Sequence, residues 1–207
     1  KDYLFGEEYN DIIFSTSRLP INYMNLLYNS TDAQILLSSN EGWGLSLTEA
    51  LLVGNPIIAN VTGGMQDQMR FEDENGDWFT PNADIPSNHT GKYKKCGKWA
   101  FPVFPSNRSI QGSPKTPYIW DDRCNAEDAA EQIMKLYLMP QDKRQECGKE
   151  GLKWATEDEA GFTSKIMGDR VINSVDTLFS TWKPRHKYEI FNPKEFTPDI
   201  LNHKLVY

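Results

Sequence analysis

Short, nearly continuous apolar runs recur along the first sixty residues of the chain. Runs of this length are typical of strands that are buried on both faces. Three of them are predicted to be strands: residues 11–15, 33–38 and 57–60. Because doubly buried strands occur mainly in parallel sheets covered by helices, this pattern indicates an α/β fold.

Helix-spaced apolar residues fill the intervals between these runs. Residues 21–28 carry apolar side chains at helical spacing, and residues 45–53 form an apolar segment that is also predicted to be a helix. Gly54 caps the second helix at its C-terminus, and Pro56 prevents its continuation. After a turn, a short helix is predicted over about 65–70. Strands and helices in this alternating order predict a doubly wound, Rossmann-like parallel sheet.

The alternation stops in the middle of the chain and gives way to helices. Residues 82–118 are rich in Pro, Gly, Ser and Asn, and their six basic residues against one acidic residue give a charge of +5. Helices are predicted over 126–139, 141–155 and 160–182. We therefore expect a Rossmann-like core with the candidate site (1–81), an irregular basic insertion (82–118), C-terminal helices of the same domain (119–182) and an extended tail (183–207).

Composition and charge narrow the class of protein. The 207 residues are 39% hydrophobic and 25% charged, as in soluble globular proteins, and no apolar run approaches the roughly 20 residues of a membrane span. With 22 basic and 29 acidic residues the net charge is −7, so no nucleic-acid partner is expected. Cys96, Cys124 and Cys147 make no disulfide framework, which indicates a cytoplasmic protein, with peripheral membrane association left open.

A glycine-containing loop joins the strand at 33–38 to the helix at 45–53. Residues 41–45 read Glu-Gly-Trp-Gly-Leu, so backbone can approach a ligand closely just where a helix begins. Unpaired N–H groups at such a helix start favour a phosphate or another anion. Glu49 follows Glu41 by eight residues, up to about 12 Å along a helix, which is comparable to the span of a nucleotide-diphosphate sugar. Acidic residues that merely stabilise a helix start are the alternative interpretation.

Three linked pieces of sequence share one resemblance. Residues 41–50 (Glu-Gly-Trp-Gly-Leu-Ser-Leu-Thr-Glu-Ala), 54–59 (Gly-Asn-Pro-Ile-Ile-Ala) and 63–67 (Gly-Gly-Met-Gln-Asp) follow in order. Together they resemble the C-terminal domain of family 4 (group 1) glycosyltransferases, which have the two-domain GT-B fold. The resemblance implies a retaining enzyme that transfers a sugar from a nucleotide-diphosphate sugar. It implies no metal and no further cofactor.

The resemblance also assigns roles to individual residues. Glu41 is the implied catalytic residue, contacting sugar hydroxyls and supporting positive charge at the anomeric carbon, and Glu49 is expected to bind the ribose. Where the family has Phe or Tyr, Trp43 keeps an apolar plane that can lie against a sugar or base. The expected sugar-donor and nucleotide contacts are Gly42, Trp43, Gly44, Leu45 and Glu49, with Gly63 and Gly64 as further candidates.

The acceptor and the rest of the enzyme are not specified by these residues. The acceptor is expected to be a glycan, lipid or protein. In the family an N-terminal domain, and an Arg–Lys pair that binds the diphosphate, would lie before Lys1, so this chain alone is expected to be incomplete. Two alternatives stay open: a non-catalytic binding or assembly module with the same half-fold, and a GT-B sugar-nucleotide epimerase.

Overall fold

Three parallel strands form the sheet at the centre of the computed structural model, which describes residues 11–79, 82, 85 and 87–184. The strands are β1 (Gln34–Leu36), β2 (Ile57–Asn60) and β3 (Ala100–Val103), in the order β1-β2-β3. Gln34 lies opposite Ile57, and Ile57 lies opposite Ala100. The sheet confirms the predicted parallel α/β fold.

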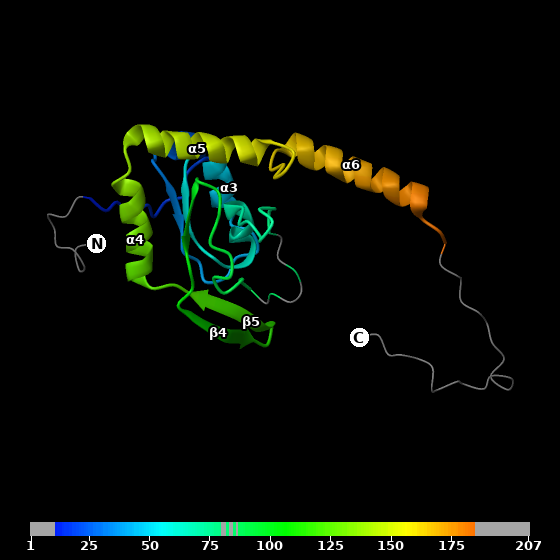
Figure 1. Ribbon diagram of the computed structural model, residues 1–207, viewed down its shortest axis with the longest axis horizontal. Helices are drawn as coiled ribbons and strands as arrows, with labels where there is room; N and C mark the ends of the chain where they lie inside the picture. The colour runs from blue at the N-terminus through cyan, green and yellow to red at the C-terminus, as the bar shows by residue number, and fades with distance from the viewer. Residues whose placement is uncertain (1–10, 80–81, 83–84, 86, 185–207) are drawn as a thin grey trace. The chain divides into compact units, whose positions relative to one another are not determined.

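Helices cover both faces of this sheet (Figure 1). α3 (Leu45–Leu52) and α5 (Gln141–Thr156) pack together on one face, and α4 (Ala126–Tyr137) contacts β2 and β3 on the other. Successive side chains of a strand point to opposite faces, so β2 contributes to both cores. Ile57 and Ala59 join the larger core beside α3 and α5, whereas Ile58 joins the smaller core beside α4.

Two glycines let α5 approach its neighbours closely. A Cβ atom on Gly148 would lie 1.8 Å from the carbonyl oxygen of Gly54, which ends α3 with a φ of +84°. A Cβ atom on Gly151 would lie 2.8 Å from the side chain of Trp99. Trp99 in turn stacks on Trp154 with ring centroids 4.8 Å apart. Glycine is therefore required at both α5 positions for this packing.

An antiparallel hairpin covers the carboxyl end of the sheet. Its strands are β4 (Asn107–Ser113) and β5 (Thr116–Arg123), and Figure 1 shows it below the central strands. The side-chain amide of Asn60, at the end of β2, donates to the carbonyls of Ser38 (3.0 Å) and Asp122 (2.7 Å). One buried amide thus joins the loop after β1, the end of β2 and the hairpin.

Residues 82–118, expected to be irregular, contain regular structure. They hold β3, β4 and the start of β5. β3 is not predicted from the sequence because it is short and contains Pro102, and a proline inside a segment argues against a strand. It is tolerated because β3 is an edge strand. The carbonyls of Trp99 and Val103 accept hydrogen bonds from β2 and the residue after it, so the nitrogen of Pro102 points to the outer edge.

Two further predictions fail in the first part of the chain, although α2 (Ile21–Asn29) forms as expected. Residues 11–15 form no strand, and Ile13 and Phe14 are 90% and 57% exposed. An apolar run without a neighbouring strand gains no ladder hydrogen bonds. The helix expected at 65–70 is replaced by two 3₁₀ turns, η1 (Gly63–Met65) and η2 (Asp67–Met69), which end at Arg70 with a φ of +51°.

The later helices match their predicted ranges. α4 and α5 fall within the expected segments, and α6 (Ser164–Thr181) lies within 160–182. Contacts divide the chain into two units, Lys1–Ile166 and Met167–Tyr207, and the sheet and candidate site belong to the first. Of the tail expected at 183–207, all but the first two residues lie outside the described part of the chain.

Candidate functional site

The loop after β1 leads into α3 at Gly44. This residue has a φ of +82° and forms the N-terminal boundary of the helix. A Cβ atom there would lie 3.0 Å from Leu36 Cδ2 and 3.2 Å from Met65 Cγ. Both the backbone conformation and the close packing therefore require glycine at position 44.

The start of α3 has the properties of an anion site. No side-chain hydrogen bond from the boundary residue Gly44 caps the helix, and Leu45 is 70% exposed. Backbone N–H groups at such a helix start lack intrahelical acceptors and carry the positive end of the helix dipole. They are therefore suited to bind a phosphate oxygen.

The Gly63–Gly64 turn presses against the loop from the neighbouring strand end. The Gly64 N–H donates to the Glu41 carbonyl at 3.2 Å, and the Gly63 N–H donates to the Ser87 carbonyl at 2.8 Å. A Cβ atom on Gly63 would lie 2.0 Å from the Glu41 carbonyl oxygen, and one on Gly64 would lie 2.2 Å from that of Gly42. Both glycines are required because backbone packs directly on backbone. Their contact with a sugar donor stays a prediction.

Gly42 differs from these glycines because its surroundings are open. A Cβ atom on Gly42 would meet no atom within 4 Å, and the residue is exposed. The adjacent Glu41 is half-buried. Space over the loop is therefore available at Gly42, beside one of the two predicted acids.

The side chain of Trp43 faces the protein. Its Nε1–H donates to Thr48 Oγ1 at 2.8 Å, and its ring meets Phe162 edge-on with centroids 5.2 Å apart. Thr48 Oγ1 donates onward to Gln68 Oε1, while Gln68 Nε2 donates to the Trp43 carbonyl at 2.6 Å. The ring therefore anchors the loop to α3, and its contact with a sugar or base stays a prediction.

Glu49 is exposed on α3 and receives a hydrogen bond from α2. Tyr28 Oη donates to Glu49 Oε2 at 2.7 Å. Burial first, and then the hydrogen bond and charge of Glu49, raise the pKa of Tyr28 to about 12, so the phenol remains a donor at neutral pH. A carboxylate can accept several hydrogen bonds, and this contact orients the Glu49 group while leaving capacity for ligand hydroxyls.

Comparison with known families adds to this geometry. The family model described as glycosyl transferases group 1 matches residues 7–87. This stretch, less than half of the chain, is similar to the group 1 glycosyltransferases. It contains β1, α3 and β2, together with the loop at Glu41 and the Gly63–Gly64 turn. No curated protein matches the chain.

This similarity to the group 1 glycosyltransferases supports glycosyl transfer as the general chemistry. The family implies a nucleotide-sugar donor and an acceptor. Within the described residues, no three His, Cys, Asp or Glu side chains are grouped so that they could hold a metal ion. None of the described helices is both long and apolar enough to cross a membrane.

The sequence pattern did not indicate the polar residues that hold the loop in place. Asn60, Thr62 and Gln66 are fully or almost fully buried at the end of β2 and in the following turn. Gln66 Nε2 donates to the carbonyls of Gly63 (3.0 Å) and Ser87 (2.8 Å). Their signal was polar residues directly after an apolar strand. Such residues lie at the carboxyl edge, where open α/β sheets bind ligands.

Asp122 of β5 is the other missed residue. Its side chain is fully buried, accepts a hydrogen bond from Thr62 Oγ1 at 2.8 Å and pairs with Arg108 Nε at 3.0 Å. Its N–H donates to the Ser39 carbonyl at 2.8 Å. Asp122 thereby fixes the hairpin to both loops of the candidate site. No local pattern identifies it, because its partners lie up to 83 residues away in the chain.

Asp67, directly after the glycine turn, gives a prediction about pH. Burial raises its pKa to about 6, above the ordinary 3.8, and its Oδ1 has no hydrogen-bond partner among the described residues. The folded state therefore holds this proton more tightly than the unfolded state. This contribution to stability is complete below about pH 4 and is lost as the pH rises through about 6.

Replacing Asp67 by Asn should remove this loss of stability at higher pH. We expect the free energy of unfolding at pH 7 to rise by about 1–2 kcal/mol, less than the full shift implies because the group is only partly buried. Urea unfolding of both proteins between about pH 4 and pH 7 measures the difference. Parallel pH profiles for Asp67→Asn and the wild type would contradict this assignment.

Proposed function

We propose that this chain carries the sugar-donor site of a retaining, metal-independent glycosyltransferase, and that the donor is a nucleotide-diphosphate sugar. The observation that carries the proposal is the open space at Gly42 beside the uncapped start of α3. It lies at the carboxyl end of β1, where ligands of open α/β sheets bind. The family's chemistry supplies the class of reaction.

The residues then have distinct tasks. The N–H groups of Trp43, Gly44 and Leu45 bind the diphosphate, and the helix dipole stabilises the negative charge that develops as the diphosphate departs. Glu41 accepts sugar hydroxyls and supports positive charge at the anomeric carbon. Glu49 accepts ribose hydroxyls from the position in which Tyr28 holds it. Gly63 and Gly64 are further candidate contacts, and their backbone packs against the Glu41 loop.

The setting of the reaction is part of the same proposal. The resemblance suggests that an N-terminal GT-B domain contributes to turnover, with a hexose as the transferred sugar. Cys96, Cys124 and Cys147 are free thiols, which supports a reducing, cytoplasmic location.

A titration tests the site without knowledge of the acceptor. UDP, GDP, ADP and their hexose conjugates are added to the chain in a calorimeter, and the tightest binder is then used with two variants. Gly42→Ala places a methyl group in the open space where the diphosphate would approach. We expect it to weaken binding about tenfold or more while the melting temperature stays unchanged.

Glu49→Ala tests the ribose contact with the same ligand and its 2′-deoxy analogue. The wild type should prefer the ribonucleotide about tenfold, and the variant should lose this preference, because the hydroxyl then has no carboxylate partner. Tyr28→Phe is the control for orientation, and it should reduce the preference only in part. Equal binding of nucleotides by wild type, Gly42→Ala and Glu49→Ala would overturn the proposed site.

A further inference from the structure

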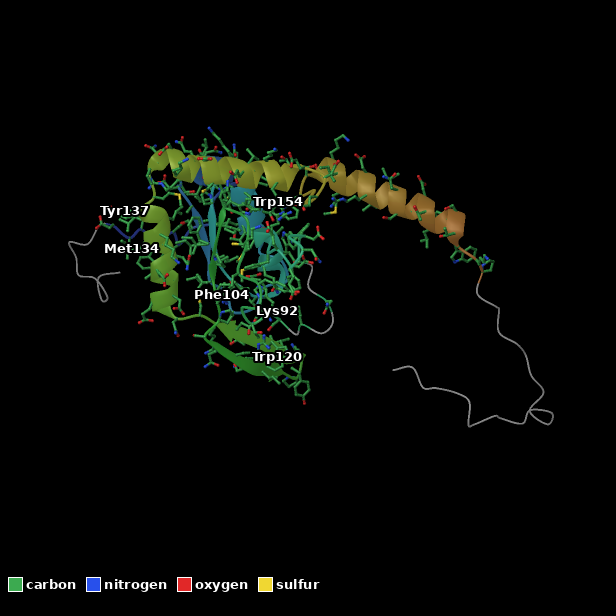
Figure 2. The ribbon with its side chains drawn as sticks, in the orientation of Figure 1. Lys92, Phe104, Trp120, Met134, Tyr137 and Trp154 are labelled. Carbon is green, nitrogen blue, oxygen red and sulfur yellow. The ribbon has the colours of Figure 1, made fainter. Side chains whose placement is uncertain are left out.

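A second pocket lies between the hairpin and the segment that precedes β3. Its cavity of about 270 Å³ is lined by residues of both segments, among them Asn88, Thr90, Lys94, Phe104, Arg108 and Asp122. We call it the Phe104 pocket. Figure 2 labels Phe104 just above the hairpin that carries Trp120. Its volume is slightly below the roughly 300–1,000 Å³ of pockets for drug-sized ligands, so it suits one hexose-sized group.

The charges in the Phe104 pocket leave one positive group uncompensated. Arg108 is paired with the buried carboxylate of Asp122 at 3.0 Å. In contrast, within the described part of the chain no carboxylate lies within 4.0 Å of the Lys94 ammonium. That ammonium lies 4.4 Å from the centre of the Phe104 ring. The pocket therefore combines a net positive charge with an aromatic surface.

The polar wall of the pocket is fixed in place. Asn88 is buried, and its Oδ1 accepts the Thr90 N–H at 2.7 Å. Arg108 Nη2 donates to the Asn88 carbonyl at 3.4 Å, and its guanidinium lies 5.2 Å from the centre of the Trp120 ring. Thr90 has a φ of +51°, which is a strained conformation for a β-branched residue. Surrounding contacts hold this strain in the wall of a cavity, as is common at binding sites.

The pocket is connected to the candidate sugar-donor loop by single residues. Asp122 accepts the hydroxyl hydrogen bond of Thr62, the residue before the glycine turn. Asn88 follows Ser87, whose carbonyl accepts the Gly63 N–H at 2.8 Å. The pocket and the donor loop are thus connected by the same buried polar network. A group bound in the pocket would lie close to the sugar-donor site.

We propose that the Phe104 pocket binds an anionic sugar unit, one that bears a phosphate or a carboxylate, and presents it as part of the acceptor. This acceptor role rests on the proposed glycosyl transfer. The sugar packs beside Phe104, where the Lys94 ammonium lies over the ring and pairs with the anionic group, and its hydroxyls bond to Arg108 and Thr90. An aromatic face beside charged donors suits a sugar, because its C–H face is apolar and its hydroxyls are polar.

The test uses small probes with the whole chain. Glucose 6-phosphate, glucuronate, glucose and inorganic phosphate are titrated by NMR or calorimetry against wild type, Lys94→Met and Lys92→Met. Lys92→Met is the matched control, since Lys92 has the same charge and lies over the Tyr93 ring (5.1 Å) but does not line the pocket. Both lysines are exposed, so both variants should keep the wild-type melting temperature.

We expect the two anionic sugars to bind more tightly than glucose or phosphate. Lys94→Met should weaken both anionic sugars about tenfold and Lys92→Met should leave them unchanged, because only Lys94 contacts the anionic group. Phe104→Ala should weaken all three sugars and leave phosphate unaffected. Phosphate that binds as well as glucose 6-phosphate, or anionic sugars that bind equally to wild type and Lys94→Met, would overturn the sugar site.

Nucleotide binding separates this proposal from the sugar-donor site. Lys94→Met should bind the nucleotide identified for the wild type without loss. If anionic sugars bind in a manner that depends on Lys94 and no nucleotide binds at all, the pocket stands as a sugar site and its acceptor role is refuted. If nucleotides bind and anionic sugars do not, the donor site stands and the Phe104 pocket proposal is wrong.

Discussion

Replacing Gly64 by alanine is expected to lower the free energy of unfolding by about 3 kcal/mol or more, at the upper end of overpacking effects. The added methyl group would lie 2.2 Å from the Gly42 carbonyl oxygen and 2.8 Å from Trp43 Cα. Both neighbours are backbone atoms and cannot rotate away, so the two loops must separate. Urea unfolding at neutral pH measures the loss.

Gly42→Ala is the matched control for this experiment. It makes the same chemical change in the same pair of packed loops, but the new methyl group meets no atom within 4 Å. Its free energy of unfolding should stay within about 0.5 kcal/mol of the wild type, as for other unstrained surface substitutions. Similar stabilities for Gly42→Ala and Gly64→Ala would show that the close approach of the glycine turn to the Glu41 loop is not formed in solution.

Replacing Asp122 by alanine should have the second large effect, a loss of about 3–5 kcal/mol, because one partner of a buried ion pair is removed. The change also takes the acceptor from Thr62 Oγ1 and leaves the Arg108 guanidinium without its carboxylate. The hairpin should then detach from the carboxyl end of the sheet. Faster amide hydrogen exchange at residues 107–123 would report that detachment.

Two measurements identify the cause of this loss. Asp121→Ala removes the neighbouring carboxylate, which pairs with the 64% exposed Arg123, and it should have a much smaller effect. Burial alone would raise the pKa of Asp122, but side-chain hydrogen bonds, first from Ser87 and then from Asn88, Thr62 and Arg108, outweigh it and lower the pKa. The contribution of Asp122 is therefore present above about pH 4 and lost as the pH falls further. A wild-type advantage over Asp122→Ala that does not shrink in acid would contradict this account.

Local sequence patterns were sufficient to predict the elements on either side of the candidate sugar-donor loop. β1 and β2 are predictable because each is a short apolar run, and α3 because an apolar segment is ended clearly by Gly54 and Pro56. These features depend on residues within a few positions of each other, which is why the sequence alone indicates them.

The remaining features depend on distant partners. The orientation of Trp43 is decided by Thr48 and by Phe162, which comes 119 residues later. Asp122 becomes important only because the hairpin folds back on the ends of β1 and β2. Likewise, residues 11–15 have the composition of a strand but no neighbour to pair with, and β4 has few apolar residues but pairs with β5. Tertiary context overrides composition in each case.

Pro102 has a consequence for how the protein behaves among other chains. Its nitrogen, on the outer side of β3, has no hydrogen to offer to an incoming strand. Edge-to-edge self-association, the first step of many aggregation reactions, is therefore hindered at the β3 edge of the sheet. Sheet extension meets no such proline in β1, whose three residues are Gln34, Ile35 and Leu36.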